Sequence, residues 1–178
     1  DELGVTLESP AGRERFDAVI FACHSDQALQ LLAEPSASET EILGALRYAD
    51  NDVVLHTDTR VLPKRRLAWA SWNYRLGGPT RQPAAVTYNM NILQGIKAPH
   101  TFCVSLNQSE AIAPDKVLAR FRYAHPQYSL AGMAAQARWE EIHGVQHSYY
   151  CGAYWANGFH EDGVVSALRV ASAFGEQL

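Results

Sequence analysis

Several signals that would assign this chain to a common class are missing. It has three cysteines among its 178 residues, an odd number, and each lies in an apolar, strand-like run. Neither a disulfide framework nor a zinc site is expected, and reduced core cysteines are typical of a cytoplasmic protein. No apolar run approaches the roughly 20 residues that span a bilayer, and the first residues do not resemble a signal peptide. We expect no integral membrane segment.

Glycine-rich phosphate loops are also missing. Neither a G-x-G-x-x-G nor a G-x-x-x-x-G-K-[ST] motif occurs, so a nucleotide cannot be held here by the usual loop. The formal net charge of -4 gives no reason to expect a nucleic-acid surface.

The hydrophobic content of 47% is sufficient for one ordinary domain or two small lobes. The chain starts at Asp1, and residues 5–23 are typical of the second half of a larger unit. We therefore expect an N-terminal portion to precede it. Residues 16–22 form an apolar run that predicts a buried strand. A short helix capped by Ser25 or Asp26 should follow, and Ser38 with Glu41 forms a capping-box pattern for a second helix.

The middle of the chain changes character. Four β-prone runs occupy residues 53–58, 66–75, 84–90 and 101–106, and the last two alternate with period two. They predict an antiparallel sheet with one face buried. Helices are expected over residues 115–122 and 130–143, the second closed by Gly144.

The C-terminal segment is the most informative part of the sequence. Residues 149–154 are β-prone, residues 157–163 carry turn formers and two glycines, and apolar residues then recur at helical spacing to Phe174. A helix start offers free N–H groups and a partial positive charge, which suit an anion or an electron-rich ring edge.

Strand and helix pieces at both ends, with an antiparallel sheet between them, predict one domain inserted into another. Residues 19–23 and 149–154 should then be strands of one parallel layer. The expected boundaries are residues 1–35 and 146–178 for the outer domain and residues 36–145 for the inserted one.

Three segments carry a family resemblance. FDAVIFACHSDQALQLL, YAHPQYS and CGAYWANGFHEDGVVSALRVA resemble the C-terminal half of FAD-dependent oxidoreductases of the flavin-containing amine oxidase superfamily. The resemblance implies an α+β fold. In it, a mainly antiparallel substrate-binding sheet is flanked by pieces of an incomplete FAD-binding domain of the Rossmann-type, glutathione-reductase-like kind. It implies an enzyme that transfers a hydride from a small-molecule substrate to FAD, partnered by the missing N-terminal half of the chain. The present residues alone are expected to be inactive.

The resemblance also implies site residues. Those assigned to the cofactor lie at strand ends and in the last loop: Ala22, Cys23, Gly152, Gly158, Phe159, His160, Glu161, Asp162, Gly163 and Val164. Asp162 is expected above all to cap the helix. Aromatic residues of the sheet either line a substrate pocket or belong to the core: Trp69, Trp72, Tyr74 and Tyr88. Ala153 and Phe159 depart from the acidic residue and the tyrosine of related proteins, so an amine substrate is not implied. The sequence nominates no catalytic acid, base or lysine.

Two other functions remain open. The chain could be a non-catalytic binding or interaction module of flavoprotein ancestry. It could also be a metal-dependent hydrolase, because three H-x-D triplets occur, at His24, His56 and His160. Such short patterns are weak, and we predict no metal site.

Overall fold

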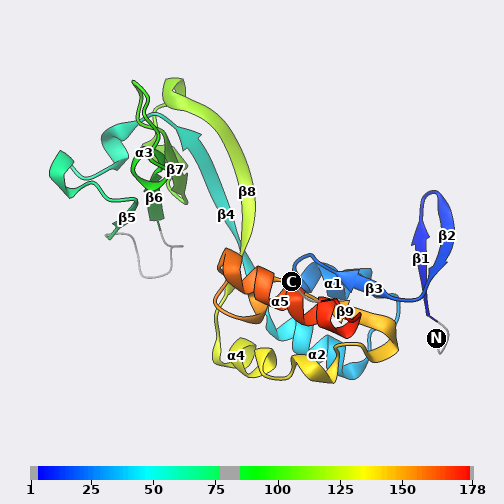
Figure 1. The fold of residues 1–178 in the computed structure, drawn as a ribbon. Coiled ribbons are helices and arrows are strands. Elements are labelled where there is room, and N and C mark those ends of the chain that lie inside the picture. The colour runs from blue at the N-terminus through cyan, green and yellow to red at the C-terminus, as the bar shows by residue number, and fades with distance from the viewer. Residues whose placement is uncertain (1–3, 77–84, 177–178) are drawn as a thin grey trace. The chain divides into compact units, whose positions relative to one another are not determined.

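The computed structural model describes residues 4–76 and 85–176, which divide into two compact units (Figure 1). Unit 1 is built from both ends of the chain, residues 1–48 and 126–178. Unit 2 is built from residues 49–125. The predicted boundaries at residues 36 and 145 therefore differ from those of the compact units, since residues 36–48 and 126–145 belong to unit 1.

Unit 1 contains two small sheets. β1 (Val5–Ser9) and β2 (Gly12–Phe16) form an antiparallel hairpin, and β3 (Val19–Phe21) pairs in parallel with β9 (Ser148–Tyr150). Parallel pairing of these two distant segments confirms the prediction that the ends of the chain meet. The single buried strand predicted over residues 16–22 is wrong, because the strand breaks between β2 and β3 and Phe16 and Ile20 are 42% and 50% exposed.

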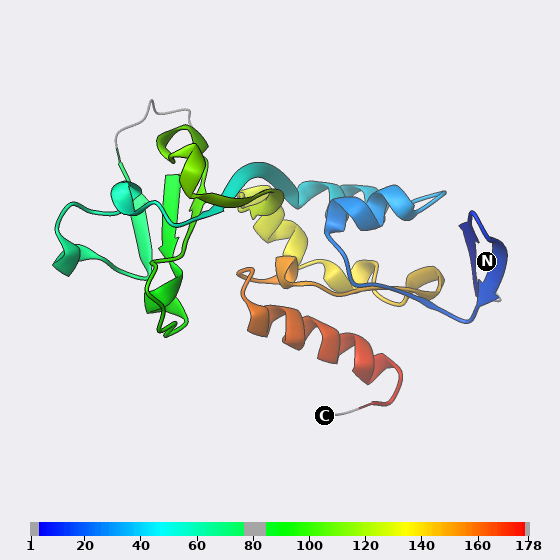
Figure 2. The ribbon, with the colours of Figure 1, turned by 90° about the horizontal axis from the view of Figure 1, so that it is seen from above.

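Helices cover this parallel pair. α1 (Ser25–Leu31), α2 (Ala37–Ala45) and α4 (Leu130–Gln136) contribute to a core that also holds Phe21 and Tyr150, whose rings stack 5.1 Å apart. The long C-terminal helix α5 (His160–Ala173) lies on the opposite side of β3 and β9 from α1 and α2 (Figure 2). The helix predicted after residue 163 is thus present, although it begins earlier.

Helix starts in unit 1 differ in detail from the prediction. At α1, His24 is the N-cap and its N–H donates to the Gln27 side chain (3.1 Å), while the Ser25 hydroxyl donates to the Leu46 carbonyl (3.0 Å). At α2 the capping box is formed by Ser36 and Glu39, two residues before the predicted pair. The predicted Ser38–Glu41 pair does not cap the helix. Glu39 takes the capping position because its carboxylate faces the core, where it accepts a hydrogen bond from the Tyr150 hydroxyl (2.5 Å).

Unit 2 is organised around a five-stranded sheet in the order β5-β6-β7-β4-β8. Its strands are β4 (Arg47–His56), β5 (Trp72–Arg75), β6 (Ala85–Asn89), β7 (Cys103–Leu106) and β8 (Val117–Gln127), with short helix α3 (Met90–Leu93) after β6. The β5–β6, β6–β7 and β7–β4 pairs are antiparallel, as predicted. Ala84, part of the predicted run over residues 84–90, lies outside the described residues.

Two predicted elements are wrong or shortened. The helix expected over residues 115–122 is β8, preceded by a single 3-10 turn, because pairing with β4 satisfies its backbone and its apolar residues alternate with period two. The helix expected over residues 130–143 ends at Gln136, although Gly144 does take the left-handed conformation, with φ at 77°. The 3-10 turns are η1 (Thr59–Val61), η2 (Arg66–Ala68), η3 (Ser109–Ala111), η4 (Pro114–Lys116), η5 (Trp139–Glu141), η6 (Val145–His147) and η7 (Ala153–Trp155).

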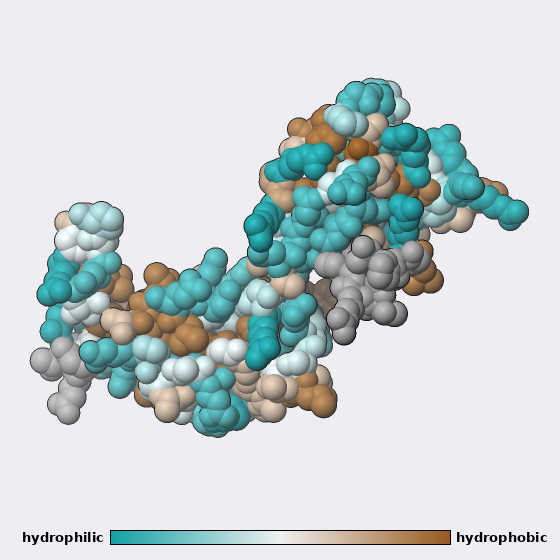
Figure 3. Space-filling view, turned by 180° about the vertical axis from the view of Figure 1, so that it is seen from behind, coloured by the Kyte–Doolittle hydropathy of each residue, from teal (hydrophilic) through white to brown (hydrophobic). Residues whose placement is uncertain are grey.

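The sheet of unit 2 has an unexpected distribution of side chains. One face is buried and mixed in polarity, and its residues are Val54, His56, Thr87, Asn89, Cys103 and Ser105. The other, which we name the apolar sheet face, is formed by Val53, Leu55, Trp72, Tyr74, Val86, Tyr88, Val104 and Leu106. Trp72 and Tyr74 on that face are 62% and 60% exposed. Apolar residues also reach the surface elsewhere in both units, as the space-filling view shows (Figure 3).

No helix in the described parts of the chain is long and apolar enough to cross a membrane.

Candidate functional site

The ends of the parallel strands in unit 1 meet at one edge of their sheet, together with the start of α5. We name this region the strand-end corner: it comprises residues 22–23 after β3, residues 151–152 after β9, turn η7 and residues 157–164. The Cys151 N–H donates to the Phe21 carbonyl (3.0 Å), which continues the parallel pairing to the edge. In open α/β sheets, ligands bind outside the carboxyl ends of parallel strands. The corner is therefore the first place in this fold to look for a site.

A buried serine ties α5 to the end of β9. The Gly152 N–H donates to Ser166 Oγ (2.8 Å), and that hydroxyl donates to the Gly163 carbonyl (2.8 Å). A Cβ added to Gly163 would lie in ordinary contact, 3.9 Å from Ala153. These contacts bring Gly152 together with residues 158–164, so two groups of predicted cofactor residues do come together.

The predicted loop over residues 157–163 is wrong at its end, because α5 already begins at His160. Asp162 reaches back and accepts hydrogen bonds from the N–H groups of Asn157 (3.1 Å) and Phe159 (2.9 Å). Asp162 thus holds the start of the helix, in agreement with its predicted capping role.

The same hydrogen bonds limit which groups of the corner can bind a ligand. Phe159 N–H is taken by Asp162 and Gly158 N–H by the Ala153 carbonyl (3.1 Å), which leaves the first helical amides, those of His160 and Glu161, at the open end. Glu161 and Asp162 stabilise the helix dipole but place negative charge there. A neutral group with acceptor atoms fits this end better than a phosphate does.

Gly158 is held against a tyrosine that the sequence analysis did not select. Its φ is +83°, and a Cβ at this position would overlap the Tyr128 hydroxyl. Burial, followed by the charge of Asp162, raises the pKa of Tyr128. The signal that could have found Tyr128 was its place in YAHPQYS, one of the segments that carried the family resemblance.

Turn η7 holds buried polar atoms that lack partners. Gln136 Nε2 fixes the turn by donating to the carbonyls of Tyr154 (2.8 Å) and Ala156 (2.7 Å). The Tyr154 hydroxyl and Trp155 Nε1 nevertheless have no hydrogen-bond partner in the described residues, although the two side chains are only 4% and 7% exposed. Burial, followed by nearby Tyr48, raises the pKa of Tyr154, so its hydroxyl keeps its proton.

The cysteines of the corner are not activated thiols. Burial raises the pKa of both Cys23 and Cys151, and Asp26 adds to the effect at Cys23. Both remain protonated at neutral pH and are poor nucleophiles. Ala22 is exposed beside them.

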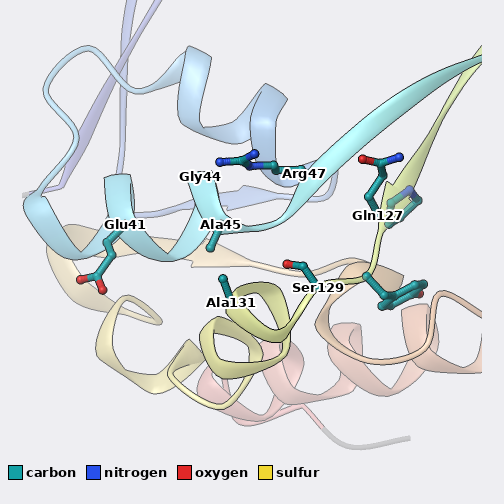
Figure 4. A pocket seen from close by; sticks show the side chains of 9 residues that line it. Glu41, Gly44, Ala45, Arg47, Gln127, Ser129 and Ala131 are labelled. Carbon is teal, nitrogen blue, oxygen red and sulfur yellow. The ribbon is translucent and has the colours of Figure 1, made fainter. Parts of the chain in front are cut away.

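An open pocket of about 900 Å³ lies beside Tyr128 in unit 1 (Figure 4). It is lined by the end of α2, the start of β4 and the approach to α4: Glu41, Gly44, Ala45, Arg47, Pro126, Gln127, Tyr128, Ser129 and Ala131. Glu41 is already paired with Arg138 (2.7 Å). The pocket offers polar groups but no cluster of acids and bases that would carry chemistry.

In unit 2 the predicted substrate aromatics separate into two places. Trp72 and Tyr88 pack edge to face on the apolar sheet face, with ring centroids 6.3 Å apart. Trp69 instead donates from Nε1 to the Pro63 carbonyl (2.8 Å), lies 5.2 Å beneath the Arg66 guanidinium, and lines a separate pocket of about 280 Å³. The structure therefore brings together Trp72 and Tyr88 but not Trp69.

The H-x-D triplets do not build a metal centre. His56 Nδ1 accepts from the Asp58 N–H (3.1 Å), which leaves Nε2 to donate to Ser105 Oγ (2.8 Å). The Asp58 carboxylate is held by Arg60 (2.6 Å) and by the Ala113 N–H (2.8 Å). Within residues 4–76 and 85–176 no group of three or more His, Cys, Asp or Glu side chains is placed to hold an ion. The same His56 geometry is wrong for activating Ser105, because the ring donates to the hydroxyl instead of accepting from it.

No protein-family model and no curated protein sequence matches this chain. Among solved structures, the chain is similar in fold to one whose title names an oxidase. A crystal structure of a "putative protoporphyrinogen oxidase" from Exiguobacterium sp. 255-15 matches with a TM-score of 0.57 and 17% sequence identity. The match covers 97% of this chain and 44% of that one, so the chain spans less than half of the length of the Exiguobacterium protein. At this identity the comparison shows the fold alone.

Proposed function

We propose that this chain is the flavin-facing and substrate-binding part of an FAD-dependent oxidoreductase. The observation that carries the proposal is the strand-end corner, where two parallel strands from opposite ends of the chain stop beside the start of a 14-residue helix. Likeness of fold to a protein described as an oxidase supports it.

The residues of the corner are compatible with an isoalloxazine ring edge. The first amides of α5 are available to acceptor atoms, and Gly158 fixes the backbone before them at a positive φ with Tyr128 packed against it. FAD, when bound, would supply the chemistry by accepting a hydride.

The roles of this chain's own residues would be orientation and exclusion of water. Gly158, Phe159, His160, Glu161, Asp162, Gly163 and Val164 would lie along the ring edge, with Ala22, Cys23 and Gly152 at the strand ends. The acidic residues Glu161 and Asp162 at the start of α5 favour binding of the flavin ring there over binding of the diphosphate, because negative charge repels phosphate. No catalytic acid or base is assigned.

Unit 2 would bind the substrate through the apolar sheet face. Trp72 and Tyr88 present an aromatic pair there, and the paired positions of β5, β6 and β7 on this face are all apolar or aromatic. Such a face selects substrates with a large apolar part and contributes binding roughly in proportion to the area covered, at about 25 cal/mol per Å².

A variant pair tests the corner in the longest natural form of the protein. Gly158→Val places a branched side chain against Tyr128 at a positive φ and should lower the affinity for FAD at least tenfold. Gly44→Ala in α2, outside the strand-end corner, would place its Cβ in ordinary contact 3.8 Å from Leu29 and should leave the affinity nearly unchanged. FAD titration followed by flavin fluorescence measures both. Equal affinities for the two variants would remove the corner from the flavin site.

The interaction-module alternative predicts a different result. A non-catalytic module of flavoprotein ancestry would show no saturable FAD binding in any variant while folding normally. Circular dichroism on the same samples separates that outcome from misfolding.

A further inference from the structure

The basic residues of this chain are concentrated in one stretch, which we name the basic stretch: residues 59–109. It contains no acidic residue and seven of the fifteen Lys and Arg residues, which gives it a formal charge of +7 in a chain whose net charge is -4. They are Arg60, Lys64, Arg65, Arg66, Arg75, Arg81 and Lys97. The rest of the chain is therefore strongly acidic, and charge is sharply segregated along the sequence.

Three of these residues lie at the tip of an ordered loop. Lys64, Arg65 and Arg66 are consecutive and exposed, and none of them forms an ion pair with a described residue. The loop ends in turn η2, which lies at the outer end of a projection from the sheet of unit 2 (Figures 1 and 2). Trp69 closes the loop through its bond to the Pro63 carbonyl, and the Ala68 N–H donates to the Arg65 carbonyl (2.9 Å). The tip is built by its own hydrogen bonds.

Large apolar side chains accompany these charges. Leu67, between Arg66 and Ala68 in the turn itself, is fully exposed at 103%. Ile92 of α3, which lines one pocket with Arg66 and Leu67, is 49% exposed, and Leu76 and Leu93 are 84% and 42% exposed. Exposed basic groups accompanied by protruding aliphatic groups are typical of surfaces that enter a membrane interface.

We propose that the loop of residues 63–69, within the basic stretch, docks on an anionic lipid surface, with Lys64, Arg65 and Arg66 among the headgroups and Leu67 inserted beneath them. Charge complementarity identifies the occupant: basic residues close to an anionic bilayer each contribute about 1 kcal/mol, while an exposed leucine gains free energy only where it leaves water. A nucleic acid would use the charges but leave Leu67 and Leu76 in water, so lipid fits both observations. This proposal does not depend on the proposed flavin chemistry.

Flotation with lipid vesicles tests it on the full chain. The protein should bind vesicles of phosphatidylcholine mixed with phosphatidylglycerol, bind pure phosphatidylcholine much less, and dissociate as ionic strength rises. Arg65→Gln combined with Arg66→Gln should weaken partitioning roughly 25-fold, about fivefold for each charge. Leu67→Ser should weaken it about tenfold, because it removes the inserted side chain.

Two matched controls make the same chemical changes outside the basic stretch. Arg120→Gln in β8 and Leu31→Ser in α1 alter exposed residues and should leave partitioning within about twofold. Equal partitioning of wild type into charged and neutral vesicles, or equal effects of the controls, would overturn the proposal. So would a nucleic-acid surface, shown by tight binding to single-stranded polyuridylate that Leu67→Ser leaves unchanged. Circular dichroism confirms that each variant is folded.

Discussion

Two constraints disfavour a side chain at residue 158. Its positive φ alone disfavours a side chain, and the Tyr128 hydroxyl stands where a Cβ would be. These two constraints can be separated because only one of them depends on Tyr128.

We predict that Gly158→Ala lowers the free energy of unfolding by about 1–2 kcal/mol. In a Tyr128→Phe background the same change should cost less, because the overlapping hydroxyl is gone while the positive φ remains. Denaturant unfolding of the wild type, the two single variants and the double variant measures the coupling between residues 158 and 128. Identical costs in both backgrounds would show that Tyr128 does not constrain residue 158.

His56 makes the stability of unit 2 depend on pH. Its side chain is fully buried, and burial lowers its pKa from the ordinary value of 6.5 despite the opposing charge of Asp58. Below about pH 6.5 the unfolded chain binds a proton that the folded chain resists, so stability falls as pH decreases and is fully present above that value.

We therefore predict that the free energy of unfolding decreases from pH 7.5 to pH 5.5 and that His56→Gln makes this decrease shallower. His143, whose pKa is also lowered by burial, contributes with the same sign, so part of the slope should persist. Urea unfolding at several pH values gives the slopes. A slope unchanged by His56→Gln would contradict the assignment.

At the scale of elements, one buried carboxylate joins α2 to β9. Glu39 is 3% exposed, caps α2 through Ser36, and accepts the Tyr150 hydroxyl at 2.5 Å. Burial, followed by its hydrogen bond to Glu39, raises the pKa of Tyr150, so the tyrosine remains the donor.

Removing either partner should leave the other buried without its hydrogen bond. We predict that Tyr150→Phe lowers the free energy of unfolding by about 1–3 kcal/mol and that Glu39→Gln has a cost in the same range. The double variant should cost less than the sum of the two, as thermal or denaturant unfolding can show. Additive costs would mean that the two side chains do not act as a pair.

The elements also show where sequence reasoning succeeds. The parallel pairing of β3 with β9 follows from the layout of strand and helix pieces at both ends of the chain, and the presence of α5 follows from helical spacing. The helix predicted over residues 115–122 was wrong because their composition suits a helix, whereas pairing with the neighbouring β4 makes them part of β8. The capping box predicted at Ser38 and Glu41 was wrong because an equivalent pair, Ser36 and Glu39, lies two residues earlier. Burial of the Glu39 side chain favours that earlier pair.

The site was less accessible to sequence reasoning than the fold. Asp162 was identified as a cap from its position before an apolar helix. Tyr128 and Ser166 could not be placed, because their partners at Gly158 and Gly152 lie 30 and 14 residues away in the chain. The apolar sheet face was also hidden, since alternation shows that two faces differ but not which of them is covered.

At the scale of the whole molecule, the chain combines two units with different surfaces. Unit 1 joins the two ends of the chain around a parallel strand pair, and unit 2 presents an apolar sheet face and the basic stretch. A two-stranded parallel sheet is small for a structure of this kind, because parallel sheets are normally larger and covered on both faces.

Flavin content tests the central claim most directly. The protein should be purified with any coding sequence that continues upstream in frame, incubated with excess FAD, freed of unbound cofactor, and denatured to release what remains. We predict about one FAD per chain by absorbance. Folded protein that retains no flavin would contradict the proposed FAD site and leave a binding module as the function of this fold.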